Sequence, residues 1–198
     1  MLENEYEQRC WSKSSYVMGI DEAGRGPLCG PLVVACCILP INYDHEEIND
    51  SKQLTEKKRE RLFPVIIRDA VYYKFKIVSP KEIDQYDIYH TTQRAMKELS
   101  LSTNIHELTI TDAMPLDDPN TISMIKGDAR SISIAAASIL AKVLRDHIMY
   151  GYDVLYPQYE YANHKGYGTK RHLELMEQYG LNELYRMSYR PCREIKLF

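Results

Sequence analysis

Four acidic residues stand at or just after short apolar segments, at the points where a β-sheet would present its rim. They are Asp21, Glu22, Asp112 and Asp128. Ligands of α/β proteins bind at such rims, and strands far apart in sequence would bring these carboxylates together there. Grouped carboxylates repel one another and resist ionising together unless a cation lies among them. The pattern therefore predicts a divalent-cation site, although Asp112 or Asp128 taken singly is more often a turn residue.

The ligand atoms of this predicted site are all carboxylate oxygens. Hard cations prefer oxygen donors, so we expect Mn²⁺ or Mg²⁺ rather than Zn²⁺. Two such ions about 4 Å apart would clamp one phosphate group, one of them activating water and the other stabilising the departing oxygen. The pattern thus favours metal-dependent chemistry on a phosphodiester. A further acid, Asp146, lies about four helical turns beyond the Asp128 region, and we expect it to be a salt-bridged structural residue.

The acidic pair Asp21 and Glu22 is followed at once by a glycine-flanked loop, Gly24-Arg25-Gly26. Glycine has no Cβ, so the backbone of this loop can approach a sugar or a phosphate closely, while an arginine there can hold a phosphate with two hydrogen bonds. Adjacent residues of a regular strand point to opposite faces. Either the strand is distorted at the acidic pair, or Glu22 reaches round the edge of the sheet. We expect the first, an irregular strand end, which would let both carboxylates face one cation.

Alternating strand and helix patterns position these residues. Apolar or β-branched runs predict strands at residues 16–20, 28–39, 71–78, 106–111 and 121–125. Helical periodicity predicts helices at residues 55–63, 87–100, 131–150 and 170–179. Pro64 should end or kink the first of these helices. The helix at 131–150 is apolar nearly all round, which predicts a central, buried position.

Strands first, then alternating strands and helices, predict an α/β fold, with a mixed sheet and helices on both faces. At 198 residues with 44% hydrophobic content, the chain is long enough to bury one proper core. We expect a polar N-terminal segment at 1–15 and a catalytic core at 16–155. A helical, substrate-binding C-terminal extension at 156–198 would belong to the same domain.

Composition and charge exclude several classes of protein. The first fifteen residues lack the apolar centre of a secretion signal, and the longest apolar run, 28–40, is too short to cross a bilayer. Five cysteines without a Cys-x-x-Cys spacing argue against a disulfide framework or a zinc site. We therefore expect a reduced, cytoplasmic protein with no membrane role. The net charge is −3, but seven Lys and Arg outnumber five Glu from Glu160 onward, which suits a local phosphate-binding groove.

Four sequence blocks occur in the order that is typical of the ribonuclease HII family. They are Asp21 to Pro27 with Gly30 to Ala35, Asp50 to Leu54, Lys126 to Asp128 with Ser133 to Val143, and Lys165 to Thr169. Together they span most of the chain from Tyr16 onward, so the chain resembles this family closely. Arg25 in the loop, and only fifteen residues before the first strand, resemble ribonuclease HII more than the related ribonuclease HIII.

The resemblance implies a ribonuclease-H-like fold with a mixed five-stranded sheet and a small helical C-terminal extension. It implies a metal-dependent endonuclease that hydrolyses the RNA strand of RNA–DNA hybrids, including single ribonucleotides embedded in duplex DNA, and leaves 3′-hydroxyl and 5′-phosphate ends. The family's catalytic, metal-binding acids correspond to Asp21, Glu22, Asp112 and Asp128. We expect the enzyme to be a monomer.

We expect substrate contacts from a second group of residues. They are Gly24, Arg25, Gly26, Ser51, Lys52, Lys165 and Tyr167. Distinguishing RNA from DNA requires a contact with the 2′-hydroxyl group, for which the backbone of the glycine-flanked loop is suited. Tyr167, on a second loop with glycines and lysines, would stack on a sugar or base. The chain departs from the family at Ala113, where glycine is usual, and at Tyr185 and Tyr189, where histidine and phenylalanine are common.

Two other functions are compatible with parts of the pattern. A non-catalytic module that binds RNA–DNA hybrids would use the same fold, but a mere binder gains nothing from clustered negative charge facing phosphates. A nucleotide-phosphate enzyme would use Gly24, Gly26 and Gly30 as a cradle, but their spacing matches neither a P-loop nor a dinucleotide fingerprint. The presence of all four acids favours the endonuclease.

Overall fold

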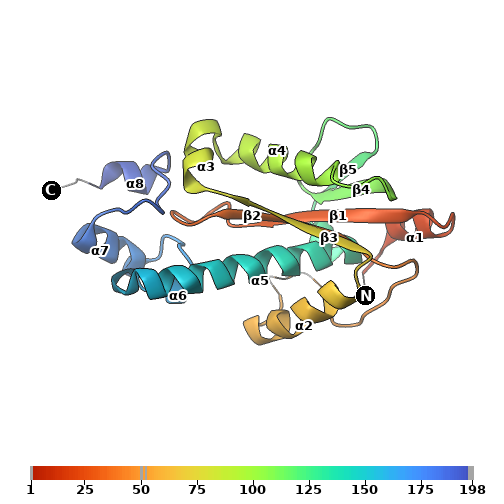
Figure 1. Ribbon diagram of the computed structural model, residues 1–198, viewed down its shortest axis with the longest axis horizontal. Coiled ribbons are helices and arrows are strands. Elements are labelled where there is room, and N and C mark those ends of the chain that lie inside the picture. The colour runs from red at the N-terminus through yellow and green to blue at the C-terminus, as the bar shows by residue number, and fades with distance from the viewer. Residues whose placement is uncertain (1, 50, 52, 196–198) are drawn as a thin grey trace.

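The part of the chain that the structure describes forms one sheet of five strands, and Figure 1 shows how they are arranged. The computed structural model describes residues 2–49, 51 and 53–195. The strands are β1 (Tyr16–Ala23), β2 (Leu32–Ile38), β3 (Tyr72–Val78), β4 (His106–Asp112) and β5 (Thr121–Met124), in the order β3-β2-β1-β4-β5. The pairs β1–β2 and β2–β3 are antiparallel, whereas β1–β4 and β4–β5 are parallel. The prediction of a mixed five-stranded sheet is confirmed.

Helices cover both faces of this sheet. They are α1 (Glu5–Trp11), α2 (Glu56–Asp69), α3 (Pro80–Tyr86), α4 (Ile88–Ser100), α5 (Ile132–Leu155), α6 (Tyr161–His164), α7 (Lys170–Tyr179) and α8 (Arg190–Glu194). Figure 1 shows α3 and α4 on one face, and α2 and α5 on the other. Short 3₁₀ turns at Gly127–Ala129 and Pro157–Tyr159 flank α5. Within the described ranges, no helix is both long and apolar enough to span a membrane.

Strand β2 shows why the sheet needs helices on both faces. Every residue of β2 is buried. The residues that pack with α2 and α5 are Val33, Ala35 and Cys37, and those that pack with α4 are Val34, Cys36 and Ile38. Because neighbours in a strand point to opposite faces, a strand without polar residues is stable only where both faces are covered.

Helix α5 is the buried centre of one layer, as the sequence predicts. Ser131 caps the helix by accepting a hydrogen bond from the backbone N–H of Ile134 (3.1 Å). Gly19 of β1 lets the helix lie close to the sheet, because a Cβ at this position would be only 2.2 Å from the carbonyl carbon of Ser133. The strand and the helix that flank the acidic residues are therefore held at a fixed, short distance.

The expectation of an irregular strand end at Asp21 and Glu22 is wrong. β1 continues as a regular strand to Ala23 because β2 pairs with it over that whole length. Asp21 lies opposite Ala35, and Glu22 lies opposite Val34. The two neighbouring carboxylates therefore leave opposite faces of the strand.

Of the two effects expected of Pro64, an end or a kink of the helix, the end is wrong, since α2 continues to Asp69. Leu62 and Ile66 lie on either side of the proline and pack into the core. This packing compensates for the hydrogen bond that a proline cannot donate inside a helix. A second difference is the helix α1 in the polar N-terminal segment, which the apolar pattern does not predict.

The C-terminal helices α6, α7 and α8 lie beyond one end of the sheet (Figure 1). They share a hydrophobic cluster with residues 28–29, which follow β1. The predicted strand at 28–39 therefore begins only at Leu32. The segment before it pairs with the C-terminal segment instead, through an isolated β-bridge between Cys29 and Tyr185. The last part of the chain is thereby joined to the loop after β1.

Candidate active site

Two of the predicted acids, Asp21 and Asp112, lie side by side on the parallel strands β1 and β4. Ile20 is paired with Thr111, so the two aspartates are the next residues of each strand and point to the same face. Gly19, two residues before Asp21, contacts α5, which identifies this face as the one that α5 covers. The regular sheet alone thus brings two carboxylates together against a buried helix.

The third acid, Asp128, lies in the 3₁₀ turn Gly127–Ala129 that leads into α5. The backbone N–H of Gly127 donates a hydrogen bond to Oδ1 of Asp112 (2.8 Å), which fastens the turn to the end of β4. A Cβ on Gly127 would lie 2.6 Å from Cδ1 of Ile134, so a larger residue would push the turn away from the helix. Because this turn lies close to both β4 and α5, the side chain of Asp128 points toward Asp112 and Asp21.

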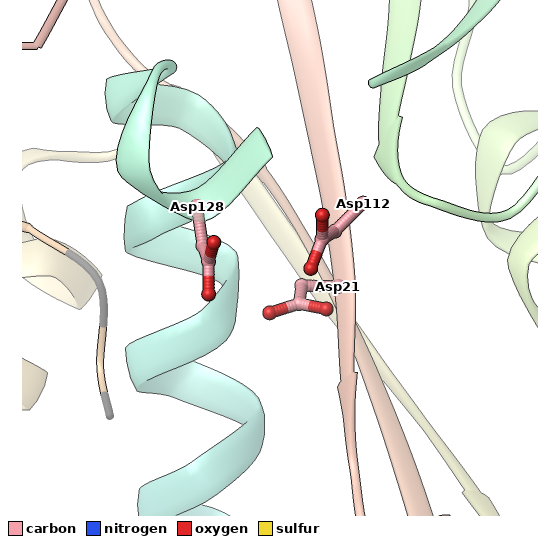
Figure 2. Close-up of side chains that lie close together, drawn as sticks. All are labelled: Asp21, Asp112 and Asp128. Atoms are coloured by element: carbon pink, nitrogen blue, oxygen red, sulfur yellow. The ribbon is translucent and has the colours of Figure 1, made fainter. Parts of the chain in front are cut away.

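The carboxylates of Asp21, Asp112 and Asp128 point toward one another in Figure 2. One oxygen from each lies within 4.8 Å of the others. Asp21 and Asp128 are buried, and Asp112 is half-buried. Burial raises the pKa of Asp21 well above its usual value, and the negative charges of Glu22 and Asp112 raise it further. A cation among these carboxylates would offset the cost of ionising them in a buried position.

Glu22 stands apart from this group of three carboxylates. Its side chain leaves the opposite face of β1 and approaches Arg25, with 3.5 Å between Oε1 and Nη1. Glu22 nevertheless lines the same cavity as Asp21 and Asp112. The structure therefore brings three of the four predicted acids into one group and places the fourth at its margin.

A cavity of about 370 Å³ opens over the acidic group and joins it to the glycine-flanked loop. It is lined by Asp21, Glu22, Ala23, Gly24, Arg25, Gly26, Ser51, Arg59, Asp112, Ser138, Lys142 and Tyr167. One wall thus carries carboxylates, and another carries basic groups and bare backbone. This arrangement suits a phosphodiester, because cations on the acids and basic side chains would both attract it.

Four residues of this lining were not among the predicted site residues. They are Ala23, Arg59, Ser138 and Lys142. Ser138 and Lys142 are four residues apart on α5 and so lie on one face of that helix. Arg59 belongs to a basic cluster before and within α2. The available signals were the four-residue spacing of Ser138 and Lys142 within the predicted helix at 131–150 and the basic cluster around Arg59.

The glycine-flanked loop is shaped by two different constraints. Gly24 has φ +102°, and a Cβ there would lie 2.2 Å from Nε of Arg145. Gly26 has open space around it: a Cβ would meet only the Tyr167 ring, at 3.7 Å. Gly24 is therefore required by the fold, whereas Gly26 keeps room for a ligand between the two loops.

The remaining predicted contact residues divide into two groups. Tyr167 and Ser51 line the cavity; Tyr167 is exposed, and the hydroxyl oxygen of Ser51 lies 2.7 Å from that of Ser138. Lys165 is turned away, because its ammonium contacts the carbonyl of Ala162 and the ring of Tyr150. Lys52 lies outside the described residues.

Asp146 is a salt-bridged acid, as predicted. Its carboxylate lies 2.6 Å from Nζ of Lys142 and 4.0 Å from Nη2 of Arg59. Burial lowers the pKa of Lys142, while Asp146 opposes this shift. The ion pairs hold two basic side chains at the cavity wall and leave Asp146 outside the group of Asp21, Asp112 and Asp128.

A comparison of sequences with known families gives one extended match. The family model described as Ribonuclease HII matches residues 18–192. Among individual proteins, the Ribonuclease HII of Levilactobacillus brevis is 47% identical over 193 residues, covering 96% of this chain and 75% of that protein. The match includes both the acidic group and the two loops at the cavity.

Comparison with solved structures gives the same fold. The structure of ribonuclease H2 from Pyrococcus horikoshii OT3 matches with a TM-score of 0.76 at 28% identity, covering 91% of this chain and 96% of that chain. Bst-RNase HIII in complex with Mn²⁺ matches with a TM-score of 0.71 at 15% identity, covering 98% of this chain and 72% of that chain. The second likeness supports the fold alone.

Proposed function

Because the chain belongs to the ribonuclease HII family and is a metal-dependent endoribonuclease acting on RNA in RNA–DNA hybrids, we propose that its predicted acids carry the reaction. These catalytic, metal-binding acids are Asp21, Glu22, Asp112 and Asp128. The observation that supports this assignment is the meeting of three carboxylates, from β1, β4 and the turn before α5, within 4.8 Å. The resemblance found in the sequence, and the activity that it implies, are confirmed at the level of the family.

The donor set fits Mn²⁺ or Mg²⁺, and we propose these as the cofactors. Its three close members are carboxylates, which are hard oxygen donors. Burial first, and then repulsion from Glu22 and Asp112, raise the pKa of Asp21, and a divalent cation would offset both effects. Bound divalent cations supply a Lewis acid that lowers the pKa of water and stabilises charge on a phosphate and on a departing 3′-oxygen. Mn²⁺ in the structure of Bst-RNase HIII belongs to that protein and makes it the first ion to test.

The other residues of the cavity bind and orient the substrate. In this proposal the backbone N–H groups of Gly24-Arg25-Gly26 donate to a 2′-hydroxyl oxygen, while the Arg25 side chain binds a phosphate. Tyr167 stacks on the sugar or base beside the cleaved bond. Ser51 and Lys52 contact the phosphate backbone. Lys165 reaches it only after its ammonium breaks the contact with the carbonyl of Ala162. Incision on the 5′ side of a ribonucleotide would then leave 3′-hydroxyl and 5′-phosphate ends.

The Asp112→Asn variant tests the assignment of the acids. It keeps an oxygen that accepts from the backbone N–H of Gly127 but removes the charge that a cation needs. We expect it to bind a labelled hybrid and to lose cleavage in Mn²⁺ or Mg²⁺. A duplex with one embedded ribonucleotide, cut on the 5′ side by the wild-type protein only, supports the proposal. Full activity of the variant would remove Asp112 from the reaction.

We also propose a monomeric, cytoplasmic enzyme in which residues 16–155 form the catalytic core and 156–198 extend the substrate-binding surface. The shared hydrophobic cluster between the C-terminal helices and residues 28–29 supports one cooperative unit. Sedimentation of the purified chain at micromolar concentration tests the monomer, and cell fractionation tests the location. A single unfolding transition for both parts, followed by separate probes, tests the single domain.

A further inference from the structure

The side chain of Arg186 is completely buried beneath the glycine-flanked loop, far from it in sequence. Its guanidinium donates hydrogen bonds to three backbone carbonyls. They are those of Gly24 (2.6 Å), Arg25 (3.0 Å) and Gly30 (2.9 Å). One side chain from the C-terminal segment thus holds three peptide groups at the edge of the cavity.

The charge of Arg186 is stabilised by these carbonyl dipoles and by Tyr189. Nη1 of Arg186 donates to the Tyr189 hydroxyl (2.9 Å), and this hydroxyl donates in turn to the carbonyl of Arg25 (2.5 Å). The nearby acid Asp84 accepts hydrogen bonds from the backbone N–H groups of Met187 and Ser188 instead. Asp84 therefore anchors the segment that carries Arg186 and Tyr189, and the two side chains are left to hold the loop.

The direction of these carbonyls fixes the direction of the neighbouring N–H groups. In a trans peptide, the C=O of one residue and the N–H of the next point in opposite directions. The carbonyls of Gly24 and Arg25 face Arg186, so the N–H groups of Arg25 and Gly26 face away from it. Both residues line the cavity that also contains Tyr167. The hydrogen bonds to Arg186 on the buried side of the loop thus leave the N–H groups of Arg25 and Gly26 on its other side.

We propose that Arg186 and Tyr189 are positioning residues for the choice between ribose and deoxyribose. They hold two loop peptides with their N–H groups aimed at a 2′-oxygen, so that this recognition needs no rearrangement when substrate binds. This inference rests on the proposed function, in which the loop Gly24-Arg25-Gly26 reads the 2′-hydroxyl. The Tyr189 hydroxyl adds a second link in this arrangement, because it accepts from Arg186 and donates to the carbonyl of Arg25.

A role in substrate choice differs measurably from a merely structural one. If Arg186 only stabilised the fold, its replacement would lower the amount of active enzyme and affect all substrates alike. If it orients the N–H donors, replacement lowers cleavage most where a 2′-hydroxyl is present. The decisive quantity is therefore a ratio of kcat/KM values, which does not depend on the fraction of enzyme that is folded.

The experiment compares two duplexes that differ at one nucleotide: one carries a ribonucleotide and the other carries its 2′-fluoro analogue, a much poorer hydrogen-bond acceptor. We expect Arg186→Lys to lower the preference for the ribonucleotide by about tenfold, which corresponds to about 1.4 kcal/mol. Tyr189→Phe should lower it by about two- to threefold. Arg190→Lys is the matched control, because this exposed arginine pairs with Glu194, and its preference should equal that of the wild type.

An unchanged preference in Arg186→Lys, with only a lower melting temperature, would overturn the inference. Should Arg186→Lys fail to fold, Tyr189→Phe decides: a lowered preference supports the positioning role, and an unchanged one overturns it. Gly26→Ala separates this result from the proposed function. If Gly26→Ala leaves the preference intact, the loop does not read the 2′-hydroxyl. If only Gly26→Ala lowers it, the loop reads the sugar without help from Arg186.

Discussion

The two walls of the cavity are built on opposite principles. The acidic wall places Asp21 and Asp112 on neighbouring parallel strands, where sheet geometry alone aligns them. The recognition wall is an irregular loop, held by Arg145 and Arg186, whose guanidinium groups donate to backbone carbonyls. Carboxylates lie close together in the first wall, whereas in the second wall backbone carbonyl dipoles surround the charged guanidinium groups.

The two walls therefore differ in whether they need a bound ligand to balance their charges. In the proposed function a bound cation completes the acidic wall, because burial and neighbouring acids oppose ionisation of Asp21. The recognition wall is complete without a ligand. Burial lowers the pKa of Arg145 to about 10, which still leaves it protonated at neutral pH. Two buried positive charges beneath the loop also favour an approaching phosphate.

The largest expected effect comes from Asp21→Asn, which tests the incomplete wall. Cleavage should fall by at least about 10³-fold, because a carboxylate central to the metal site is lost. Without divalent cations, the melting temperature at pH 8 should rise, since an ionised carboxylate no longer has to be buried. Asp44→Asn, at an exposed acid, is the control and should change neither quantity. A less stable Asp21→Asn protein would contradict the proposed electrostatic strain.

The next effect tests the completed wall through Gly24→Ala. The new Cβ would meet the Arg145 side chain at 2.2 Å in a backbone conformation that disfavours alanine. We expect a loss of about 3 kcal/mol in the free energy of unfolding, measured in urea. Gly151→Ala is the matched control, because nothing lies within 4 Å of a Cβ on this helical glycine. That substitution should stabilise α5 by about 0.5–1 kcal/mol.

The second loop at the cavity, which carries Tyr167, is sensitive to pH because two stacked, neutral histidines hold it. His172 donates from Nδ1 to the carbonyl of Tyr167 (2.9 Å), and Nε2 accepts from the Tyr185 hydroxyl (3.0 Å). The ring centroids of His164 and His172 are 3.9 Å apart, and Nδ1 of His164 accepts a hydrogen bond from the backbone N–H of Gly166. A proton on either ring would break one of these bonds and repel a charge on the other ring.

Burial, aided by repulsion from His164, lowers the pKa of His172 to about 4. The unfolded chain takes up a proton near pH 6.5 and the native chain near pH 4, so native stability falls as the pH drops between these values. From pH 6.5 to 5 the free energy of unfolding should fall by about 1.5 kcal/mol on account of this group. Urea titrations of the wild type and His172→Asn measure it, and equal pH slopes would refute it.

The acidic wall was accessible from sequence because it depends on regular elements. An apolar strand followed by an acid predicts a carboxylate at a sheet rim, and three such segments predict the group of Asp21, Asp112 and Asp128. Glu22 shows the limit. The expected distortion at the end of β1 is absent because β2 extends the ladder to Ala23, which depends on pairing between strands.

The recognition wall was only partly accessible. The glycines predicted a close backbone approach, but nothing local predicts that Arg186 lies beneath Gly24, because the contact joins distant segments. The same holds for α2, where packing of residues on both sides of Pro64 overrides a local helix-breaking signal. Regular elements follow from local pattern, whereas buried polar contacts between loops require the whole fold.

The smallest expected effect concerns Lys142, where the two walls meet. Its ammonium lies 2.6 Å from Asp146, and Arg59 lies beside the same acid, so the cluster keeps a net positive charge at the cavity. We expect Lys142→Met to weaken hybrid binding several-fold, about 1 kcal/mol, with little change in kcat. The slope of log K against log salt should become shallower by about one, since one phosphate contact is lost. An unchanged slope would mean that Asp146 fully neutralises Lys142, and that the phosphates follow the loop side of the cavity instead.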